Sequence, residues 1–403
     1  MRATWRIGMF LSLFGYSGSF SQGLSLDSLI HLGIIHNPDL FVSLGEGEVV
    51  ASDTLAASPL LYPNLGLEAG YNVNDPGKPK ASLRLSQEFK PGLRTNQYQV
   101  FKASWVAKHQ LQKSRELDII LEIRSAYFNW QILIRKQALQ AEVEKKWESL
   151  ARIVSAKVKE GRLSQADEAQ VQLNRAKAHQ KVMEYQAGMN SVAKQVAFLT
   201  GTEKSHDSLA LFSIELLPTL LPLDTLQAWA SQNTDLKTLE LEVETQKHQV
   251  DLEKSIRQIP LTVSVGYDRE SDGNNIVGAG LEFPLPFSNR NQAGIARSHA
   301  ELRLGQSRQR AAEARLRTQI NDLHAQLGGL AERYQAYQKE IRALRNKQME
   351  LAEQGFFAGQ LGIFELSRLQ EDALDQEFAA LDILQSFYEH WNRLGKAVGG
   401  KSW

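Results

Sequence analysis

The sequence contains an internal repeat, which constrains the fold of this 403-residue chain more than any other feature. Four motifs occur in the same order in both halves: Asn37-Pro38-Asp39-Leu40 and Asn233-Thr234-Asp235-Leu236; Gly70-Tyr71 and Gly266-Tyr267; Gly161 with Leu163 and Gly359 with Leu361; Leu199-Thr200-Gly201 and Ala397-Val398-Gly399. The offset changes only from 196 residues (Asn37 to Asn233) to 198 residues (Gly161 to Gly359). Such self-similarity indicates a repeated structural unit. We therefore expect one domain, residues 22–400, built from repeat one at about 24–201 and repeat two at about 224–400.

Each half is predicted to begin with helix and to continue with a β-hairpin. Residues 24–57 and 223–257 carry helical patterns. Apolar and polar residues then alternate in four predicted strands: 63–73, 80–89, 260–270 and 275–284. Asn74-Asp75-Pro76-Gly77 and Ser271-Asp272-Gly273-Asn274 are turn sequences between them. Strands of about ten residues have the length of tilted membrane-spanning strands, although a soluble hairpin with one face on a core shows the same alternation.

Two very long helices are predicted after the hairpins. Residues 95–159 and 293–357 contain no proline, and at about 1.5 Å per residue each would extend for about 95 Å. In the second segment apolar residues are spaced by four and three, as in a coiled coil: Leu316, Ile320, Leu323, Leu327, Leu330, Tyr334, Tyr337, Ile341 and Leu344. The first segment has the same seam at Ile119, Ile123, Ala126, Trp130 and Leu133. Gly328-Gly329 predicts a bend in the second helix.

Each long helix is predicted to end at a tight turn from which a second helix returns. The turn sequences are Gly161-Arg162-Leu163-Ser164 and Gly359-Gln360-Leu361-Gly362. A glycine after a long helix is typical of a C-cap, and Ser164 followed by Asp167 is typical of a capping box. The returning helices run to Gly201 and Gly399. These turns therefore form two helix-turn-helix tips.

The N-terminal residues are typical of an export signal. Arg2 and Arg6 precede a short apolar stretch at residues 7–16, which predicts a signal peptide over residues 1–21. Beyond it no apolar run reaches the roughly 20 residues that a membrane-spanning helix requires. Any part of the chain that enters a membrane must therefore do so as a β-barrel.

The composition excludes several kinds of activity. The chain has no cysteine and carries 46 basic and 46 acidic residues, a balance that gives no argument for nucleic acid as a partner. None of the nine histidines has zinc-site spacing, and no phosphate-binding loop or Ser/His/Asp signature is present. A hydrolase that uses surface carboxylates would lack any motif. We therefore predict that the protein is not an enzyme and has no catalytic residue, cofactor or metal site.

Neither the strands nor the long helices complete a structure within one chain. Four strands cannot close a barrel, because the smallest known spanning barrels need about eight, and open strand edges cannot face lipid. A helix of about 95 Å needs neighbours of equal length to bury its seam. Several copies that pool their hairpins and helices would form a shared barrel continuous with a helical tube. Such an assembly is a conduit.

The chain resembles the TolC-like outer-membrane efflux proteins over about residues 24–399. The resemblance depends on the repeat, on Asn37-Pro38-Asp39-Leu40 and on the tip glycines. Its most specific part is Phe283-Pro284-Leu285-Pro286-Phe287-Ser288-Asn289-Arg290-Asn291-Gln292-Ala293-Gly294, which is similar to a segment of the heavy-metal (CzcC-type) branch. Pro284 and Pro286 are expected to end the strand, since proline cannot donate to a ladder. Gly294 is expected to let the backbone turn before the long helix.

The resemblance implies a mainly α-helical fold with a membrane β-barrel part, in which each half gives a β-hairpin and long antiparallel coiled-coil helices to a trimeric α/β barrel channel. The homotrimer would lie in the outer membrane of a Gram-negative-type cell, in contact with its lipid, and extend into the periplasm. An inner-membrane pump, driven by protons, and a periplasmic adaptor would complete a tripartite efflux pump. The tips at 161–164 and 359–362 would contact the adaptor.

The resemblance also implies a gate just past the second tip, where acidic rings close such channels and attract cations. Glu365 matches that position, and Asp167 is its counterpart in the first half. Arg368 stands one turn further, where many relatives have aspartate, which argues against a double acidic ring. Glu365 is therefore either part of a gate or the partner of Arg368 in a surface salt bridge.

The sequence thus predicts a passive duct for exported solute, with heavy-metal cations as the cargo of the CzcC-type branch. Drugs and proteins of type I secretion are alternative cargoes. A non-conducting periplasmic coiled-coil scaffold is an alternative function, although such a scaffold has no use for alternating strands with an apolar outer face.

Overall fold

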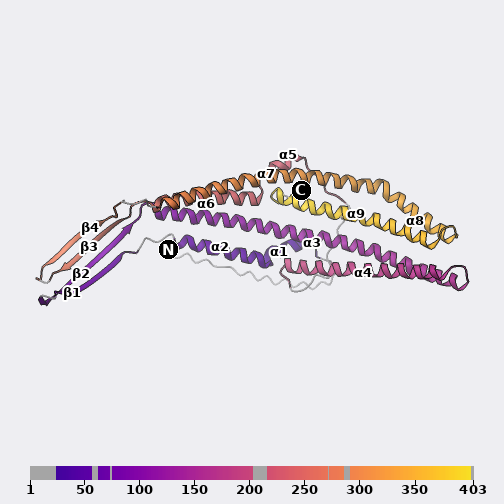
Figure 1. Cartoon of the computed structure of the whole chain (residues 1–403), viewed down its shortest axis with the longest axis horizontal. Helices are drawn as coiled ribbons and strands as arrows, with labels where there is room; N and C mark the ends of the chain where they lie inside the picture. Colours follow the sequence, from indigo (N-terminus) through magenta and orange to yellow (C-terminus); the bar gives the residue numbers. More distant parts are fainter. Residues whose placement is uncertain are drawn as a thin grey trace, which may run out of the picture.

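The computed structural model describes residues 24–56, 62–72, 75–202, 216–270, 272–285 and 291–400. The predicted signal peptide lies outside these residues. The described chain is elongated, with a four-stranded sheet at one end and long helices over the rest of its length (Figure 1). Its elements are α1 (Leu26–His36), α2 (Pro38–Ala56), β1 (Asn64–Asn72), β2 (Asp75–Phe89), α3 (Leu93–Lys159), α4 (Gln165–Leu199), α5 (Leu223–Ala230), α6 (Thr234–Ile256), β3 (Leu261–Arg269), β4 (Asn275–Glu282), α7 (Gln292–Ala336), a π-helical turn (Tyr337–Ile341), α8 (Arg342–Phe357) and α9 (Ile363–Ala397).

The two halves have the same order of elements. A pair of helices precedes each hairpin, and a long helix and a returning helix follow it. Each expected N-terminal helical stretch is divided in two, because a buried asparagine, Asn37 or Asn233, caps a new helix. The side-chain amide of Asn37 also donates to the carbonyl oxygen of Leu199 at 2.9 Å, and that of Asn233 donates to Ala397 at 3.1 Å. The repeated motifs of each half are therefore direct contact partners.

The two hairpins join into one antiparallel sheet in the order β1–β2–β3–β4. One face of the sheet is apolar and consists of two cross-strand rows: Leu67–Leu83–Tyr267–Val277 and Leu65–Leu85–Val265–Ala279. The other face carries glycine and polar residues, as in the row Gly66–Arg84–Gly266–Gly278. The apolar face is open: Leu67 is 75% exposed and Val277 is 73% exposed. A continuous exposed apolar surface marks a region that contacts a partner or a membrane.

The boundaries of β2 differ from the predicted range. This strand begins at Asp75, so that the predicted turn residues Pro76 and Gly77 belong to it. Prolines are tolerated there because β2 pairs with β3 only from Ala81 onward, which leaves its first part with one free edge. The other three strands differ from the predicted ranges by at most two residues at either end.

The second long helix is interrupted at a different place from the predicted one. Gly328-Gly329 lies inside α7, and the interruption is the π-helical turn at 337–341. A π turn closes i→i+5 hydrogen bonds and therefore contains more residues than an α turn. The apolar residues after the π turn therefore no longer lie on the same side of the helix as the buried seam before it. Leu327 is fully buried, whereas Ile341 and Leu344 of the same predicted seam are 43% and 70% exposed.

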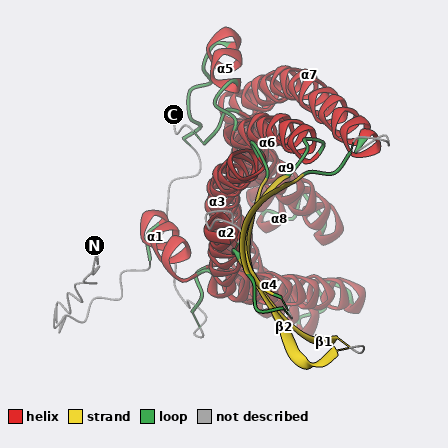
Figure 2. Cartoon of the chain, turned by 90° about the vertical axis from the view of Figure 1, so that its left-hand side faces the viewer, coloured by secondary structure: helices red, strands yellow, loops and turns green. Residues whose placement is uncertain are grey.

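Apart from the short helices α1 and α5, which pack on α3 and α7, the helices lie side by side in a single curved layer. In the half next to the sheet their order is α2, α3, α6, α7 (Figure 1). Glu46 of α2 pairs with Arg115 of α3 at 3.2 Å, and the Asn96 side chain of α3 donates to the carbonyl of Asp251 in α6 at 3.1 Å. In the half next to the tips the order is α4, α3, α9, α8. Viewed along the long axis, the helices form an arc with α4 and α7 near its two ends (Figure 2).

Candidate functional site: the helical tips and the adjoining rim

The first tip lies at the end of the molecule opposite the sheet and is closed by a glycine (Figure 1). Gly161 has φ +71°, its N–H donates to the carbonyl of Val158 at 3.0 Å, and the N–H of Arg162 donates to Lys157 at 2.9 Å. This pair of bonds is the Schellman motif, which satisfies the last carbonyls of α3. A side chain at Gly161 would strain the positive φ.

The second tip repeats this geometry at the end of α8. Gly359 has φ +74°, its N–H donates to Phe356 at 3.1 Å, and the N–H of Gln360 donates to Gly355 at 2.8 Å. Leu361 then turns inward, and a Cβ at Gly355 would meet its Cδ1 at 2.8 Å. The close contact explains why glycine stands in the last turn of the helix.

The returning helices begin differently at the two tips. Ser164 and Asp167 form the predicted capping box: the Asp167 N–H donates to Ser164 Oγ at 3.2 Å, and the Ser164 N–H donates to Asp167 Oδ2 at 2.9 Å. At the second tip Gly362 is the N-cap and offers no side chain. Glu365 therefore stands in the first turn of α9 as an exposed carboxylate, with no ion pair to any described residue. Of the two predicted gate carboxylates, Asp167 is bonded to the N-cap residue Ser164, whereas Glu365 has no ion-pair partner in the described part of the chain.

The surface salt bridge that was the alternative role for Glu365 is not present among the described residues. Arg368 points to Asp372 instead, with 4.0 Å between Arg368 Nε and Asp372 Oδ2. Both side chains are largely exposed, at 83% and 59%, and a pair of this kind contributes little free energy. Arg368 thus pairs with Asp372, four residues further along the helix, rather than with Glu365, three residues before it.

The exposed surface of the tips contains two aromatic residues that the sequence patterns above do not single out. Phe357 and Phe364 flank the second tip and are 55% and 57% exposed. By contrast, Leu163 and Leu361 are partly buried against the core between the tips, so these two predicted contact residues support the turns from inside. The sequence does contain a signal for these residues, because each phenylalanine stands two positions from a tip glycine and outside the heptad seam.

A common core holds the two helical hairpins together near the tips. Its fully or nearly buried members come from all four helices: Trp147, Leu150, Ala151, Val154, Val171, Ala178, Ala352, Phe356, Ile363 and Leu366. Between α4 and α9 the buried Asn174 amide donates to the hydroxyl of Ser367. The tips therefore form one composite surface.

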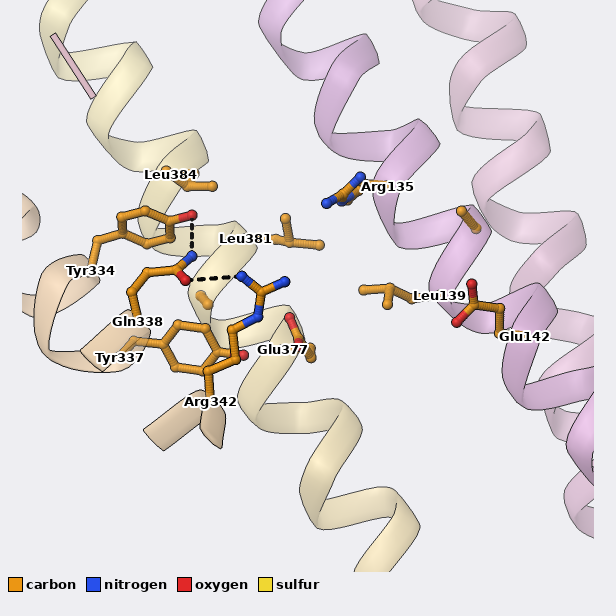
Figure 3. Close-up of a pocket in the computed structure, with 12 residues that line it drawn as sticks. Arg135, Leu139, Glu142, Tyr334, Tyr337, Gln338, Arg342, Glu377, Leu381 and Leu384 are labelled. Carbon is orange, nitrogen blue, oxygen red and sulfur yellow. Dashed lines mark hydrogen bonds between the residues drawn. The ribbon is translucent and has the colours of Figure 1, made fainter. Parts of the chain in front are cut away.

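Above the tips, polar side chains line a cavity of about 240 Å³ between α3, α9 and the π-helical turn (Figure 3). Gln338 donates to the Tyr334 hydroxyl at 2.7 Å and accepts from Arg342 at 3.0 Å. Burial raises the pKa of Tyr337 to about 12, and the nearby Glu377 carboxylate adds to the effect. These groups satisfy one another, and the lining includes no histidine, serine or cysteine that could act as a nucleophile or base.

The described residues include no group of three histidine, aspartate or glutamate side chains arranged to hold a metal ion. None of the described helices combines the length and the apolar character that crossing a bilayer requires.

Family comparison identifies the chain. The sequence profile of the family described as outer membrane efflux protein matches residues 29–202 and 225–400. The chain belongs to this family. The match confirms the resemblance to TolC-like efflux proteins drawn from the repeated motifs. Among curated relatives, the cobalt-zinc-cadmium resistance protein CzcC of Cupriavidus metallidurans is 22% identical over 250 residues, which is 62% of this chain and 60% of that relative's length.

Solved structures of outer-membrane channels share the fold of this family member. The crystal structure of CusC superposes with a TM-score of 0.80 at 15% identity, over 93% of this chain and 92% of that chain. The open state of the Neisseria gonorrhoeae MtrE outer membrane channel gives 0.77 at 17% identity, over 93% and 89%. The Campylobacter jejuni CmeC outer membrane channel gives 0.75 at 16% identity, over 99% and 93%. The predicted mainly helical, TolC-like fold is thus confirmed, and the four-stranded sheet of one chain remains open at both edges.

Proposed function

We propose that the chain is one subunit of an outer-membrane channel through which an efflux pump releases solute passively to the exterior of a Gram-negative-type cell. Membership of the outer membrane efflux protein family supports an efflux role, and the fold is that of outer-membrane channels. The open apolar face of the sheet suits contact with lipid hydrocarbon. A duct of this kind conducts solute and catalyses no reaction.

The main support for the proposal is the open sheet. Among the described residues, strand β1 pairs only with β2 and β4 only with β3. Both outer edges then have unpaired backbone groups that lipid cannot satisfy. Pairing of β4 in one copy with β1 in the next would close the sheet into a barrel. Near the tips, Ile341, Leu344 and Leu351 of the helical edge are 43%, 70% and 56% exposed, which gives the neighbouring copy an apolar surface to cover. We assign the closed assembly as a homotrimer.

The two ends of the subunit suit different partners. The sheet would lie in the outer membrane, and the composite surface of the tips, with Arg162, Gln360, Phe357 and Phe364 outward, would contact a periplasmic adaptor. An inner-membrane pump, driven by protons, would deliver solute through the adaptor. In the trimer three copies of Glu365 would form an acidic ring at the periplasmic entrance.

Heavy-metal cations are the cargo that we favour. The relative CzcC is named for resistance to cobalt, zinc and cadmium, and an acidic entrance attracts cations. Drugs and secreted proteins are the competing cargoes, since the duct is an exit and selectivity resides mainly in the pump. A deletion strain tested against cobalt, zinc, copper and silver beside dyes and bile salts separates them: sensitivity to the dyes alone would assign the chain to drug efflux.

Reconstitution of the full-length protein into planar bilayers tests the channel itself. We expect discrete conductance steps that favour cations. If folded trimers insert but conduct no ions, the channel is excluded and the periplasmic scaffold takes its place.

A further inference from the structure

The part of α7 next to the sheet has a strongly basic surface. Residues 297–317 include six exposed arginines and two glutamates: Arg297, Arg303, Arg308, Arg310, Arg315, Arg317, Glu301 and Glu313. Two of the arginines are paired along the helix, Arg297 with Glu301 at 2.8 Å and Arg317 with Glu313 at 3.0 Å. The other four make no ion pair with any described residue. Four uncompensated positive charges on one helix repel each other unless an acidic partner lies beside them.

Helix α2, at the opposite edge of the same half, has the complementary charge (Figure 1). Its 19 residues contain Asp39, Glu46, Glu48 and Asp53 and no lysine or arginine. Glu46 is compensated within the chain by Lys108 at 3.6 Å and Arg115 at 3.2 Å. Glu48 and Asp53 are exposed and make no ion pair with the described residues.

The outward face of α2 is also apolar and open. Phe41, Val42 and Val49 are 57%, 61% and 65% exposed. Gly45 lies between them, and a Cβ at this position would meet nothing within 4 Å. Glycine inside a helix costs about 1 kcal/mol relative to alanine, and no contact with a described residue requires it here. A second helix that approaches closely over Gly45 accounts for the missing side chain.

Contacts across the layer place α2 and the basic part of α7 at the same height. Glu46 pairs with Arg115 of α3, and the residue before Arg115 contacts Asp235 at the start of α6. Further along α6, Gln246 lies against Gly305 of α7. Because α6 and α7 run in opposite directions, the level of Asp235 corresponds to about residue 316 of α7. The acidic residues of α2 and the unpaired arginines of α7 therefore lie at matching heights on opposite edges.

We propose that the basic edge of α7 docks on α2 of a second copy of the chain, with the Glu48 carboxylate beside the Arg310 guanidinium. This seam rests on the proposed channel and specifies how its subunits join. Copies in a ring are related by rotation about one axis, so residues of equal height meet. Arg303 and Arg310 are seven residues apart and share one side of α7, while the exposed small residues Ala311 and Ala314 let α2 approach.

The charges determine which helix edges pair at the seam. Opposite potentials on the two edges bring α7 to α2 and disfavour pairing of two equal edges, where like charges would be opposed. The same helix edges continue into the edge strands β1 and β4, so docking of the helices aligns the strands that close the sheet. Assembly is therefore expected to weaken as salt screens the seam.

Cysteine pairs test the contact directly, since the chain has no native cysteine. In the full-length protein, Glu48→Cys combined with Arg310→Cys is expected to give covalent dimers and trimers on oxidation. Helices α3 and α6 separate α2 from α7 within one chain, so a disulfide must join two copies. The control pair is Glu48→Cys with Arg333→Cys, which lies about 34 Å further along α7 and should remain monomeric on a denaturing gel.

The outcomes distinguish the seam from the channel. An intact, conducting oligomer without a disulfide at 48/310 overturns the seam and leaves the proposed function in place, whereas a chain that never forms oligomers overturns both. Charge reversal adds a second readout: Glu48→Arg and Arg310→Glu should each speed subunit dissociation about tenfold, and the double variant should restore most of the loss. Strictly additive effects would mean that these two residues do not meet.

Discussion

Asn37 and Leu199 are 162 residues apart in sequence, and the side-chain amide of Asn37 donates to the Leu199 carbonyl at 2.9 Å. The Asn37 Oδ1 atom meanwhile accepts from the backbone N–H of Asp39 at 2.9 Å and of Leu40 at 3.3 Å. One fully buried side chain therefore caps the start of α2 and satisfies the end of α4. This contact closes the first half of the chain into one unit.

Asn37→Ala is expected to lower the free energy of unfolding by about 1–3 kcal/mol, because a buried carbonyl and the first N–H groups of α2 lose their partner. The midpoint of denaturant unfolding in detergent measures the loss. His36→Ala changes the exposed neighbour and should leave the midpoint nearly unchanged. Equal midpoints for wild type and Asn37→Ala would show that the double cap contributes no stability.

Gly359→Ala and Gly362→Ala separate backbone strain from contact at the second tip. Gly359 has φ +74° and Gly362 has φ −78°, and an added Cβ meets nothing within 4 Å at either position. Only the first substitution forces a side chain into the left-handed region, at about 1 kcal/mol. We expect the larger fall in the thermal midpoint for Gly359→Ala, and only a small one for Gly362→Ala, where alanine is a slightly poorer N-cap than glycine. A similar shift for both variants would indicate that the flexibility of the tip, rather than its φ angle, matters.

The sequence predicts those parts of the fold that depend on local pattern. The heptad seam of the first long helix is buried from Ile119 to Trp130, and the repeated motifs meet because the buried asparagine of one motif donates to a helix-end carbonyl in the other. Gly294 was interpreted wrongly as a turning point. It lies inside α7, and its Cβ would stand 2.3 Å from Asn291 Oδ1 and 2.5 Å from Glu253 Oε2. The left-handed residue at this entrance is Asn291 itself, with φ 51°.

The π-helical turn could not be predicted from the periodic pattern, because the contacts made around it are tertiary. Arg345 pairs with Glu377 of α9 in a largely buried position and donates to the Tyr337 hydroxyl at 3.1 Å. Without the extra residue in the turn, the four-three spacing would keep Ile341 and Leu344 on the inner face. The four-three spacing of apolar residues continues unchanged through residues 337–341. The sequence alone therefore cannot show where the buried side of the helix shifts. The exposed apolar edge of α8, which the proposed neighbour covers, is a consequence of this shift.

Alkaline pH is expected to destabilise the fold through two buried tyrosines. Burial raises the pKa of Tyr337 and of Tyr388 to about 12, above the ordinary value of about 10. Between these values the unfolded chain loses phenolic protons that the folded chain keeps, so the free energy of unfolding falls as pH rises. Below about pH 10 both phenols are protonated in either state, and their contribution is complete.

Tyr388→Phe isolates part of this effect. The ring stacks on Phe128 with 4.1 Å between centroids, and phenylalanine keeps that contact while it removes the ionisable hydroxyl. Denaturant unfolding at pH 8 and pH 11 should show a smaller loss of stability for Tyr388→Phe than for wild type. The same loss in both proteins would place the alkaline transition in other groups.

The charge at the proposed periplasmic entrance can be tested by single-channel recording. If Glu365 forms an acidic ring in the trimer, Glu365→Gln should lower the ratio of potassium to chloride permeability by about twofold or more, because the ring concentrates cations at the entrance. Arg368→Gln should raise the ratio, since it removes a positive charge one turn away. Glu371→Gln is the matched control, because that carboxylate is exposed but lies 3.9 Å from Lys177. Unchanged selectivity in single-channel recordings of Glu365→Gln would leave Glu365 with a local role only, as a carboxylate that favours the N-terminal end of the α9 dipole.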